Sequence, residues 1–287
     1  MSPPRWCRFR GDLTYEGGSS TKPIDFHAHI YTDEMAPKAI ASVKRRMGVR
    51  VPGLGTVADL QDSMAKAGVE KSIILPLAPL PKHVRPTNEF FLAAADGDGL
   101  VPFGAIHPFQ SDLEEELDRL LAAGVRGVKA VPFLQGFYPD DPRCDRLYEG
   151  VAERGMVLLL HAGKVPEDLP EFFGTPDRFA RMAERHPDLV VILAHLGGWE
   201  MWSAVRKYLI PAAENVFFDT AYISPSLTSE EACDLISEIG PDRVLFGTDY
   251  PWTDQAKEVD FIEGMDLSAQ EKKMILSENA ERLLFRR

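Results

Sequence analysis

Two apolar runs, residues 156–160 and 189–194, constrain the fold more than any other part of this sequence. They read Met-Val-Leu-Leu-Leu and Leu-Val-Val-Ile-Leu-Ala, so neither run has a polar residue at any position. Strands that are apolar on both faces occur in parallel sheets covered by helices, because each face then packs against apolar side chains. The two runs therefore predict central strands of an α/β fold, and they are not edge strands.

A similar unit recurs along most of the chain: a short apolar run, a loop, an amphipathic helix, and a Gly or Pro before the next run. Such alternation predicts parallel strands joined by helices. We expect strands at residues 23–30, 71–77, 100–107, 125–131, 156–161, 189–195, 216–223 and 243–249. We expect helices at residues 34–48, 56–68, 88–95, 112–123, 143–154, 176–186, 200–209, 228–239 and from 268 onward. Eight strand-helix units in roughly 250 residues are typical of a (β/α)8 TIM barrel, which is the fold class we predict.

Local signals mark several helix ends. Thr56 is a typical N-cap, and Gly68 is a typical C-terminal stop for the helix between them. Two capping boxes, Thr228 to Glu231 and Ser268 to Glu271, open later helices. An open doubly wound sheet is the alternative fold, but no Gly-x-Gly-x-x-Gly loop follows the first strand to give such a sheet a nucleotide site.

The chain has 287 residues, which exceeds the usual size of one domain but suits a single barrel. Residues 1–22 contain a Pro-Pro pair and a Gly-Gly-Ser-Ser stretch, which are typical of an extension and a flexible linker. We therefore predict an N-terminal extension at 1–22 and one barrel domain at 23–287.

Charge and cysteine content exclude several classes of function. A net charge of -12 argues against nucleic acid as a partner, because phosphate recognition needs clustered Lys and Arg. The three cysteines are far apart, so a disulfide framework and a thiolate zinc site are both disfavoured. No apolar run reaches membrane-spanning length, so we expect no membrane partner and a cytoplasmic location. A homo-oligomer is left open.

Polar residues that could bind a metal stand at the ends of four expected strands. His27 and His29 end the first, His161 the fifth, His195 the sixth and Asp249 the eighth. The carboxyl ends of barrel strands meet at one mouth, so these side chains should converge there. Side chains two apart on a strand share a face, which makes the first two histidines half of a tetrahedral site for a metal such as zinc. Each residue alone has a structural alternative, as a hydrogen-bonded core histidine or a turn-capping aspartate.

The chain resembles the amidohydrolase superfamily, in its amidohydrolase-related branch of metal-dependent hydrolases and decarboxylases. The resemblance runs from residue 23 to the C-terminus and rests on the motifs Asp-Phe-His-Ala-His (25–29), His-Ala-Gly (161–163), Ala-His-Leu-Gly-Gly (194–198) and Gly-Thr-Asp-Tyr-Pro (247–251). It implies a (β/α)8 barrel in which the metal ligands are His27, His29, His161 and Asp249. It also implies that His195 lies beside the metal as an acid-base or polarising group.

The chemistry of such a site follows from the ion. A zinc ion lowers the pKa of bound water from near 16 toward about 7, so hydroxide is available at neutral pH. Asp249 can accept the water's proton and pass it to the leaving group, while His195 stabilises the oxyanion. We expect one divalent metal per chain, with zinc preferred and manganese or iron as alternatives.

Four further residues are candidates for substrate binding. Lys129 lies on the expected fourth strand, where some superfamily members carry a carboxylated lysine between two metals. We prefer a lysine paired with a carboxylate such as Asp25 or Asp219. Lys164 and Arg85, in expected loops, would favour an anionic, carboxylate-bearing small molecule, and Trp252 would supply an aromatic wall.

Three functional hypotheses remain from the sequence. The main interpretation is a metal-dependent hydrolase of an ester, lactone or amide bond in a small molecule. The alternative is a non-oxidative decarboxylase of an aromatic or enoic acid, which uses the same metal to polarise a substrate oxygen. A barrel that binds ligand without turnover is disfavoured, because the ligand set is intact. The compact length and the lack of long insertions favour the hydrolase.

Overall fold

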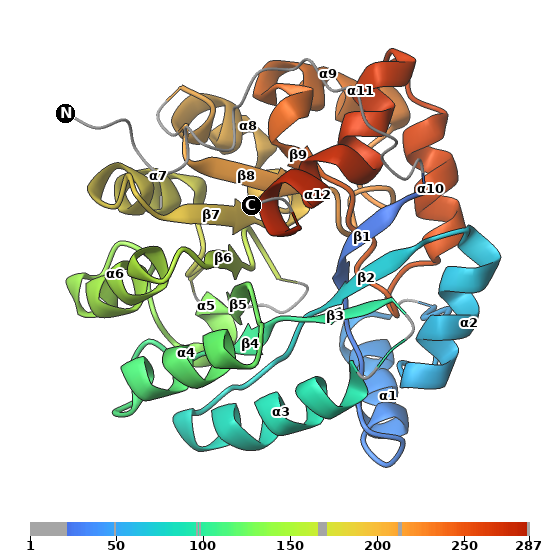
Figure 1. The fold of residues 1–287 in the computed structure, drawn as a ribbon. Coiled ribbons are helices and arrows are strands. Elements are labelled where there is room, and N and C mark those ends of the chain that lie inside the picture. The colour runs from blue at the N-terminus through green and yellow to red at the C-terminus, as the bar shows by residue number, and fades with distance from the viewer. Residues whose placement is uncertain are drawn as a thin grey trace.

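The computed structural model describes residues 22–48, 50–95, 97, 99–165, 171–211 and 214–285, and the expected extension at 1–22 lies outside them except for its last residue. The strands are β1 (Ile24–Ala28), β2 (Lys71–Ile74), β3 (Leu100–Pro102), β4 (Gly104–Ala105), β5 (Gly127–Ala130), β6 (Val157–Leu160), β7 (Val190–Leu193), β8 (Val216–Asp219) and β9 (Val244–Leu245). The helices around them are α1 (Ala36–Met47), α2 (Val57–Ala67), α3 (Pro81–Ala94), α4 (Leu113–Ala122), α5 (Pro132–Gln135), α6 (Asp145–Glu153), α7 (Pro176–Arg185), α8 (Trp202–Ala204), α9 (Ser229–Ile239), α10 (Gln255–Glu263), α11 (Ala269–Lys273) and α12 (Asn279–Leu284) (Figure 1). Single π-helical turns continue two of the helices, at Val205–Leu209 and Met274–Glu278.

The strands pair in parallel, in chain order, as two sheets that continue into one another. One sheet has the order β1-β2-β3 and the other runs from β4 to β9. The expected third strand is divided at Phe103, because its first half pairs with β2 and its second half with β5. Two backbone hydrogen bonds between β1 and the segment at β9 close the ring of strands. The N–H of Phe26 donates to the carbonyl of Phe246, and the N–H of Asp249 donates to the carbonyl of His27, both at 2.7 Å. The fold is a (β/α)8 barrel, as predicted.

The two faces of the central strands pack in separate clusters. Val157 and Leu159 of β6 lie in the cluster that fills the barrel, which also contains Phe26 and Phe103 and is closed by Leu283 of α12. The alternate residues of β6 and β7 pack outward, in the larger cluster beneath the helices. This division explains why both central runs are apolar at every position.

Most helix signals are confirmed, and one expected loop is wrong. Thr56 caps α2 by accepting from the backbone N–H of Asp59, and the two predicted capping boxes open α9 and α11. The loop expected after β2 is instead the start of α3, which begins at Pro81. Proline suits the first helical turn, because its fixed φ is helical and its missing N–H has no partner there in any case. Helix α10 was not expected, and Asp254 caps it.

Candidate metal centre and active site

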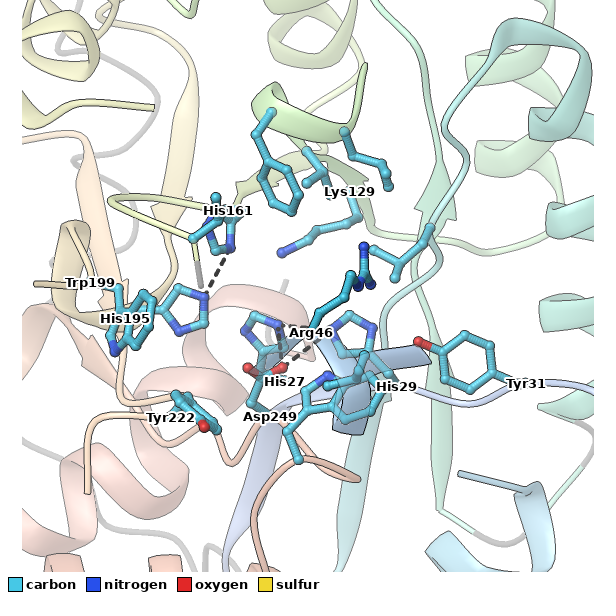
Figure 2. A pocket seen from close by; sticks show the side chains of 17 residues that line it. His27, His29, Tyr31, Arg46, Lys129, His161, His195, Trp199, Tyr222 and Asp249 are labelled. Carbon is cyan, nitrogen blue, oxygen red and sulfur yellow. Dashed lines mark hydrogen bonds and ion pairs between the residues drawn. The ribbon is translucent and has the colours of Figure 1, made fainter. Parts of the chain in front are cut away.

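The polar residues at the strand ends line a single pocket at the mouth of the barrel (Figure 2). The cavity measures about 210 Å³, which is small beside the roughly 300–1,000 Å³ of pockets for drug-sized ligands. Its wall consists of His27, His29, Tyr31, Val43, Arg46, Leu77, Lys129, Val131, Phe133, Leu134, His161, Val165, His195, Trp199, Tyr222, Asp249 and Trp252. The size and the largely apolar lining suit one small molecule.

Hydrogen bonds determine which ring nitrogens of His27 and His29 carry a proton. Nδ1 of His29 lies 2.8 Å from the carbonyl oxygen of Leu75, which only accepts, so this nitrogen is the donor. Nδ1 of His27 lies 2.8 Å from Oδ2 of Asp219 and donates to that carboxylate. In the neutral rings, both Nε2 atoms therefore present lone pairs, which is the form that binds metal.

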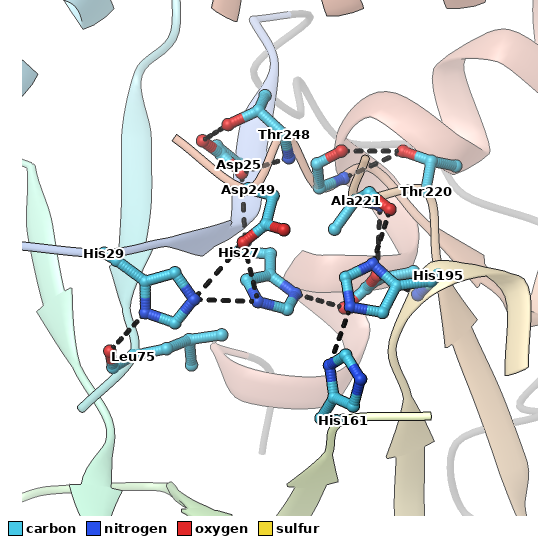
Figure 3. A network of polar contacts seen from close by, with 12 residues as sticks. Asp25, His27, His29, Leu75, His161, His195, Thr220, Ala221, Thr248 and Asp249 are labelled. Atoms are coloured by element: carbon cyan, nitrogen blue, oxygen red, sulfur yellow. Dashed lines mark hydrogen bonds and ion pairs between the residues drawn. The ribbon is translucent and has the colours of Figure 1, made fainter. Parts of the chain in front are cut away.

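The two Nε2 atoms converge with a carboxylate oxygen (Figure 3). The Nε2 atoms of His27 and His29 lie 3.2 Å apart. Oδ1 of Asp249 lies 3.4 Å from Nε2 of His27 and 3.3 Å from Nε2 of His29. Three acceptors at this separation repel one another unless a cation lies among them. Two imidazoles and one carboxylate suit zinc, manganese or iron, so this buried cluster fits a divalent metal.

The surroundings keep the cluster in its ligating form. The pKa of His27 is well below its ordinary value, first because of burial and then because of the charge on Lys129. Burial tends to raise the pKa of Asp249, but the nearby His27 and His29 outweigh it and lower that pKa to about 2. At neutral pH the cluster thus contains the neutral imidazole of His27 and the ionised carboxylate of Asp249.

His161 lies in the same pocket but outside this cluster of three. Its Nδ1 is 3.1 Å from Nε2 of His195, and its Nε2 is 3.1 Å from the carbonyl oxygen of Lys164. The ring of His195 is held in turn by the carbonyl of Ala221, 2.7 Å from its Nδ1, and its centre is 5.5 Å from that of His27. Metal ligation by His161 stays a prediction.

Asp219 was named in the sequence analysis only as a possible partner of Lys129, and its contacts with the histidines of the site were missed. It ends β8 and is fully buried. Its Oδ2 accepts from His27, and its Oδ1 accepts from the backbone N–H groups of His195 at 2.9 Å and Ala221 at 3.0 Å. Burial raises the pKa of Asp219, but the accepted hydrogen bonds favour its ionised form. The strand expected at residues 216–223 placed Asp219 in its interior, whereas β8 ends at Asp219, so the strand-end signal that identified His161 and Asp249 becomes visible only in the structure.

The predicted substrate-binding residues separate into two groups. Lys129 and Trp252 line the pocket. Arg85 and Lys164 do not: Nη1 of Arg85 lies 2.8 Å from Glu116 on α4, and Nζ of Lys164 lies 3.5 Å from Glu200. Arg85 turns outward because the loop expected around it is helical, so its direction follows the face of α3 on which it stands.

Two cationic side chains, Lys129 and Arg46, line the cavity. Burial lowers the pKa of Lys129 to about 8, although the charges of Asp219 and Asp249 oppose this effect. Arg46, which the sequence analysis did not single out, reaches the same cavity from α1 (Figure 2). At neutral pH the pocket thus presents positive charge opposite the acceptor cluster.

Backbone strain concentrates at this site. His195, Tyr222 and Asp249 line the pocket and have positive φ angles of 59°, 55° and 64°. Such angles cost about 1–3 kcal/mol each in residues other than glycine and persist where surrounding contacts enforce them. The hydrogen bonds that Asp219 accepts from the backbone N–H groups of His195 and Ala221 help to hold the backbone in these conformations.

In the part of the chain that the structure describes, no helix is both long and apolar enough to cross a membrane.

Comparison with known proteins gives a family match over most of the chain. A family model described as amidohydrolase matches residues 24–286. Gamma-resorcylate decarboxylase of Polaromonas sp. is 30% identical over 118 residues, which cover 35% of this chain and 35% of that protein. The matched region thus spans about a third of this curated relative.

Solved structures share the fold at lower identity. A dihydroxybenzoic acid decarboxylase from Polaromonas sp. JS666, with bound manganese and the inhibitor 2-nitroresorcinol, has a TM-score of 0.71 at 20% identity, covering 92% of this chain and 96% of that one. A 2,6-dihydroxybenzoate decarboxylase from Rhizobium has a TM-score of 0.71 at 20% identity, covering 92% and 98%. A 5-carboxyvanillate decarboxylase from Sphingomonas paucimobilis has a TM-score of 0.66 at 16% identity, covering 92% and 99%.

Proposed function

The chain belongs to the amidohydrolase family, and from that premise we propose that it is a metal-dependent decarboxylase of small hydroxylated aromatic acids. One observation carries the proposal: a small cavity combines an all-acceptor ligand cluster with two cations and an otherwise apolar and aromatic wall. The named decarboxylases among its relatives support the same reaction.

Each part of the pocket has a use in this reaction. The cations Lys129 and Arg46 attract an anionic substrate, and the aromatic side chains Phe133, Trp199 and Trp252 accept its ring. An apolar surrounding favours loss of carbon dioxide, because negative charge localised on the carboxylate moves to the ring and its oxygen as the neutral molecule leaves. A divalent ion held by the cluster would polarise a substrate oxygen. The bound manganese of one structural relative supports a divalent ion, and zinc remains our preference.

We assign the proton transfer to Asp249. Its low pKa keeps the carboxylate ionised at neutral pH, and a divalent ion held by the cluster would make a substrate hydroxyl acidic enough for this carboxylate to take its proton. The same group then returns this proton to the ring carbon that carries the carboxylate. The bond between that carbon and the carboxylate breaks, carbon dioxide leaves, and solvent restores the hydroxyl proton. His195, beside this path, stabilises the negative oxygen.

Hydrolysis of an ester, lactone or amide is the second candidate. The ionised carboxylate of Asp249, in contact with His29 in the ligand cluster, could equally take a proton from water. The sequence alone favoured this reaction, whereas the relatives favour decarboxylation, so we rank decarboxylation first.

The deciding experiment is a substrate screen on metal-loaded protein with two readouts. Dihydroxybenzoates, other aromatic and enoic acids, lactones and esters are each incubated with zinc-loaded or manganese-loaded protein, and carbon dioxide and acid release are measured. We expect carbon dioxide from a hydroxylated aromatic acid, none from chelator-treated protein, and a rate lower by about 10² to 10⁴ from Asp249→Asn. Acid release from a lactone or ester without carbon dioxide from any acid would replace this proposal with the hydrolase.

A further inference from the structure

The turn that carries Asp249 lies at the seam where the barrel closes. Strand β9 ends at Leu245, so the ladder with β8 stops before the ligand. Beyond that point, the backbone N–H of Gly247 donates to Oγ1 of Thr220 at 3.0 Å, which is a side chain. On the β1 side backbone pairing continues, because the N–H of Asp249 donates to the carbonyl of His27 at 2.7 Å and the N–H of His29 donates to the carbonyl of Tyr250 at 2.6 Å. Side-chain contacts hold the rest of the turn, so the position of the third ligand depends on both.

Asp25 makes the largest set of such contacts from the β1 side. Its Oδ1 accepts from the backbone N–H of His27 at 2.9 Å and of Thr248 at 3.0 Å. Its Oδ2 accepts from Oγ1 of Thr248 at 2.7 Å and from Nε2 of Gln255 at 2.7 Å. The side chain is fully buried, and all four donors come from β1 or from the segment that follows β9. One carboxylate thus joins both halves of the ligand cluster (Figure 3).

We propose that Asp25 is a positioning residue for the metal centre, which sets Asp249 against His27 and His29 by clamping the seam between their strands. A shift of this seam would separate the three acceptor atoms, which now lie within 4.8 Å of one another. The inference rests on the proposed metal site but not on the reaction, so metal binding by itself tests it.

The structure also supplies a variant that separates position from charge. In Asp25→Asn the side-chain oxygen can keep the two backbone donors, and the new NH2 group faces Thr248 Oγ1 and Gln255. Among the described residues, Oε1 of Gln255 is buried without a hydrogen-bond partner, so this amide can turn and accept. Asn therefore preserves the clamp without the charge, whereas Ala removes the clamp.

The experiment measures zinc and manganese affinity of metal-free protein by chelator competition, with no substrate present. Asp25→Ala should lose about 10–100-fold in affinity, as outer-shell changes at metal sites typically do. Asp25→Asn should stay close to wild type. The control Ser72→Ala removes the 3.2 Å contact between Ser72 and Gln255 in the same buried network, leaves the four contacts of Asp25 in place, and should bind metal normally.

Two results would overturn the proposal. Asp25→Ala with wild-type affinity would make the clamp irrelevant, and Asp25→Asn as weak as Asp25→Ala would assign the effect to charge. If Asp25→Ala does not fold, Gln255→Met decides, because it deletes the 2.7 Å contact of Nε2 with Asp25 and leaves the carboxylate in place, while Ser72→Ala controls for the other contact of that amide. Reduced affinity then supports the clamp, and unchanged affinity refutes it. An inactive protein with normal affinities would count against the proposed reaction alone.

Discussion

Replacing Asp219 with Asn should weaken metal binding through the protonation of His27. The carboxylate now accepts from Nδ1 of His27 on one oxygen and from two backbone N–H groups on the other. If the amide oxygen of Asn keeps the two backbone donors, its NH2 group faces Nδ1 of His27. That contact favours the proton on Nε2, which removes a lone pair from the ligand cluster.

The opposite orientation of the amide is also costly. With its oxygen on His27, the NH2 group would face the backbone N–H groups of His195 and Ala221, both buried. An unsatisfied buried donor costs about 1–3 kcal/mol, so two cost about 2–6 kcal/mol. This penalty disfavours the second orientation, so the first should dominate, and we expect Asp219→Asn to lose about 10–100-fold in metal affinity, which equals about 1.4–2.8 kcal/mol.

Titration calorimetry with zinc and manganese measures the loss, and nitrogen NMR of His27 in metal-free protein shows which ring nitrogen carries the proton. The matched control is Glu116→Gln, a carboxylate-to-amide change at a buried position on α4, where Glu116 binds Arg85 and Arg119 away from the pocket. The control should be less stable but bind metal normally. Wild-type metal affinity in Asp219→Asn, or an unchanged proton position on His27, would refute the reasoning.

Three further predictions concern ligands, cations and pH. Asp249→Asn should keep most of its metal while turnover falls by about 10² to 10⁴, whereas His27→Ala should lose metal and turnover together; metal analysis beside a rate assay separates them. Lys129→Met should raise KM for an anionic substrate, and exposed Lys38→Met should not; equal KM values would remove Lys129 from substrate binding. Burial raises the pKa of Glu258 from 4.5 to about 7. The folded state therefore binds more protons than the unfolded state between these values, and this contribution to stability, complete below pH 4.5, is lost as pH rises through 7. Glu258→Gln should abolish that loss, so the free energy of unfolding of the variant, relative to wild type, should be higher at pH 8 than at pH 5. Denaturant unfolding at both pH values measures this, and an equal difference between variant and wild type at both would contradict the raised pKa of Glu258.

Much of the fold could be predicted from local pattern. The two-sided apolar runs required central parallel strands, and the polar residues that ended them fell at one mouth because all barrel strands point the same way. Helix ends with side-chain caps, such as Thr56, were also predictable, since a cap depends on neighbours a few residues away. The loop expected near Arg85 failed because prolines at a helix start resemble those of a loop.

The sequence by itself determined that a barrel would form and that His27, His29 and Asp249 would meet, because strand direction and a two-residue period are local properties. Only the tertiary structure decided the protonation of those histidines, which depends on the carbonyl of Leu75 and the carboxylate of Asp219. A backbone carbonyl is present in every residue and leaves no mark in a sequence. Which cations face the pocket was likewise decided by packing, because the rotation of a helix against the barrel sets where a long side chain points.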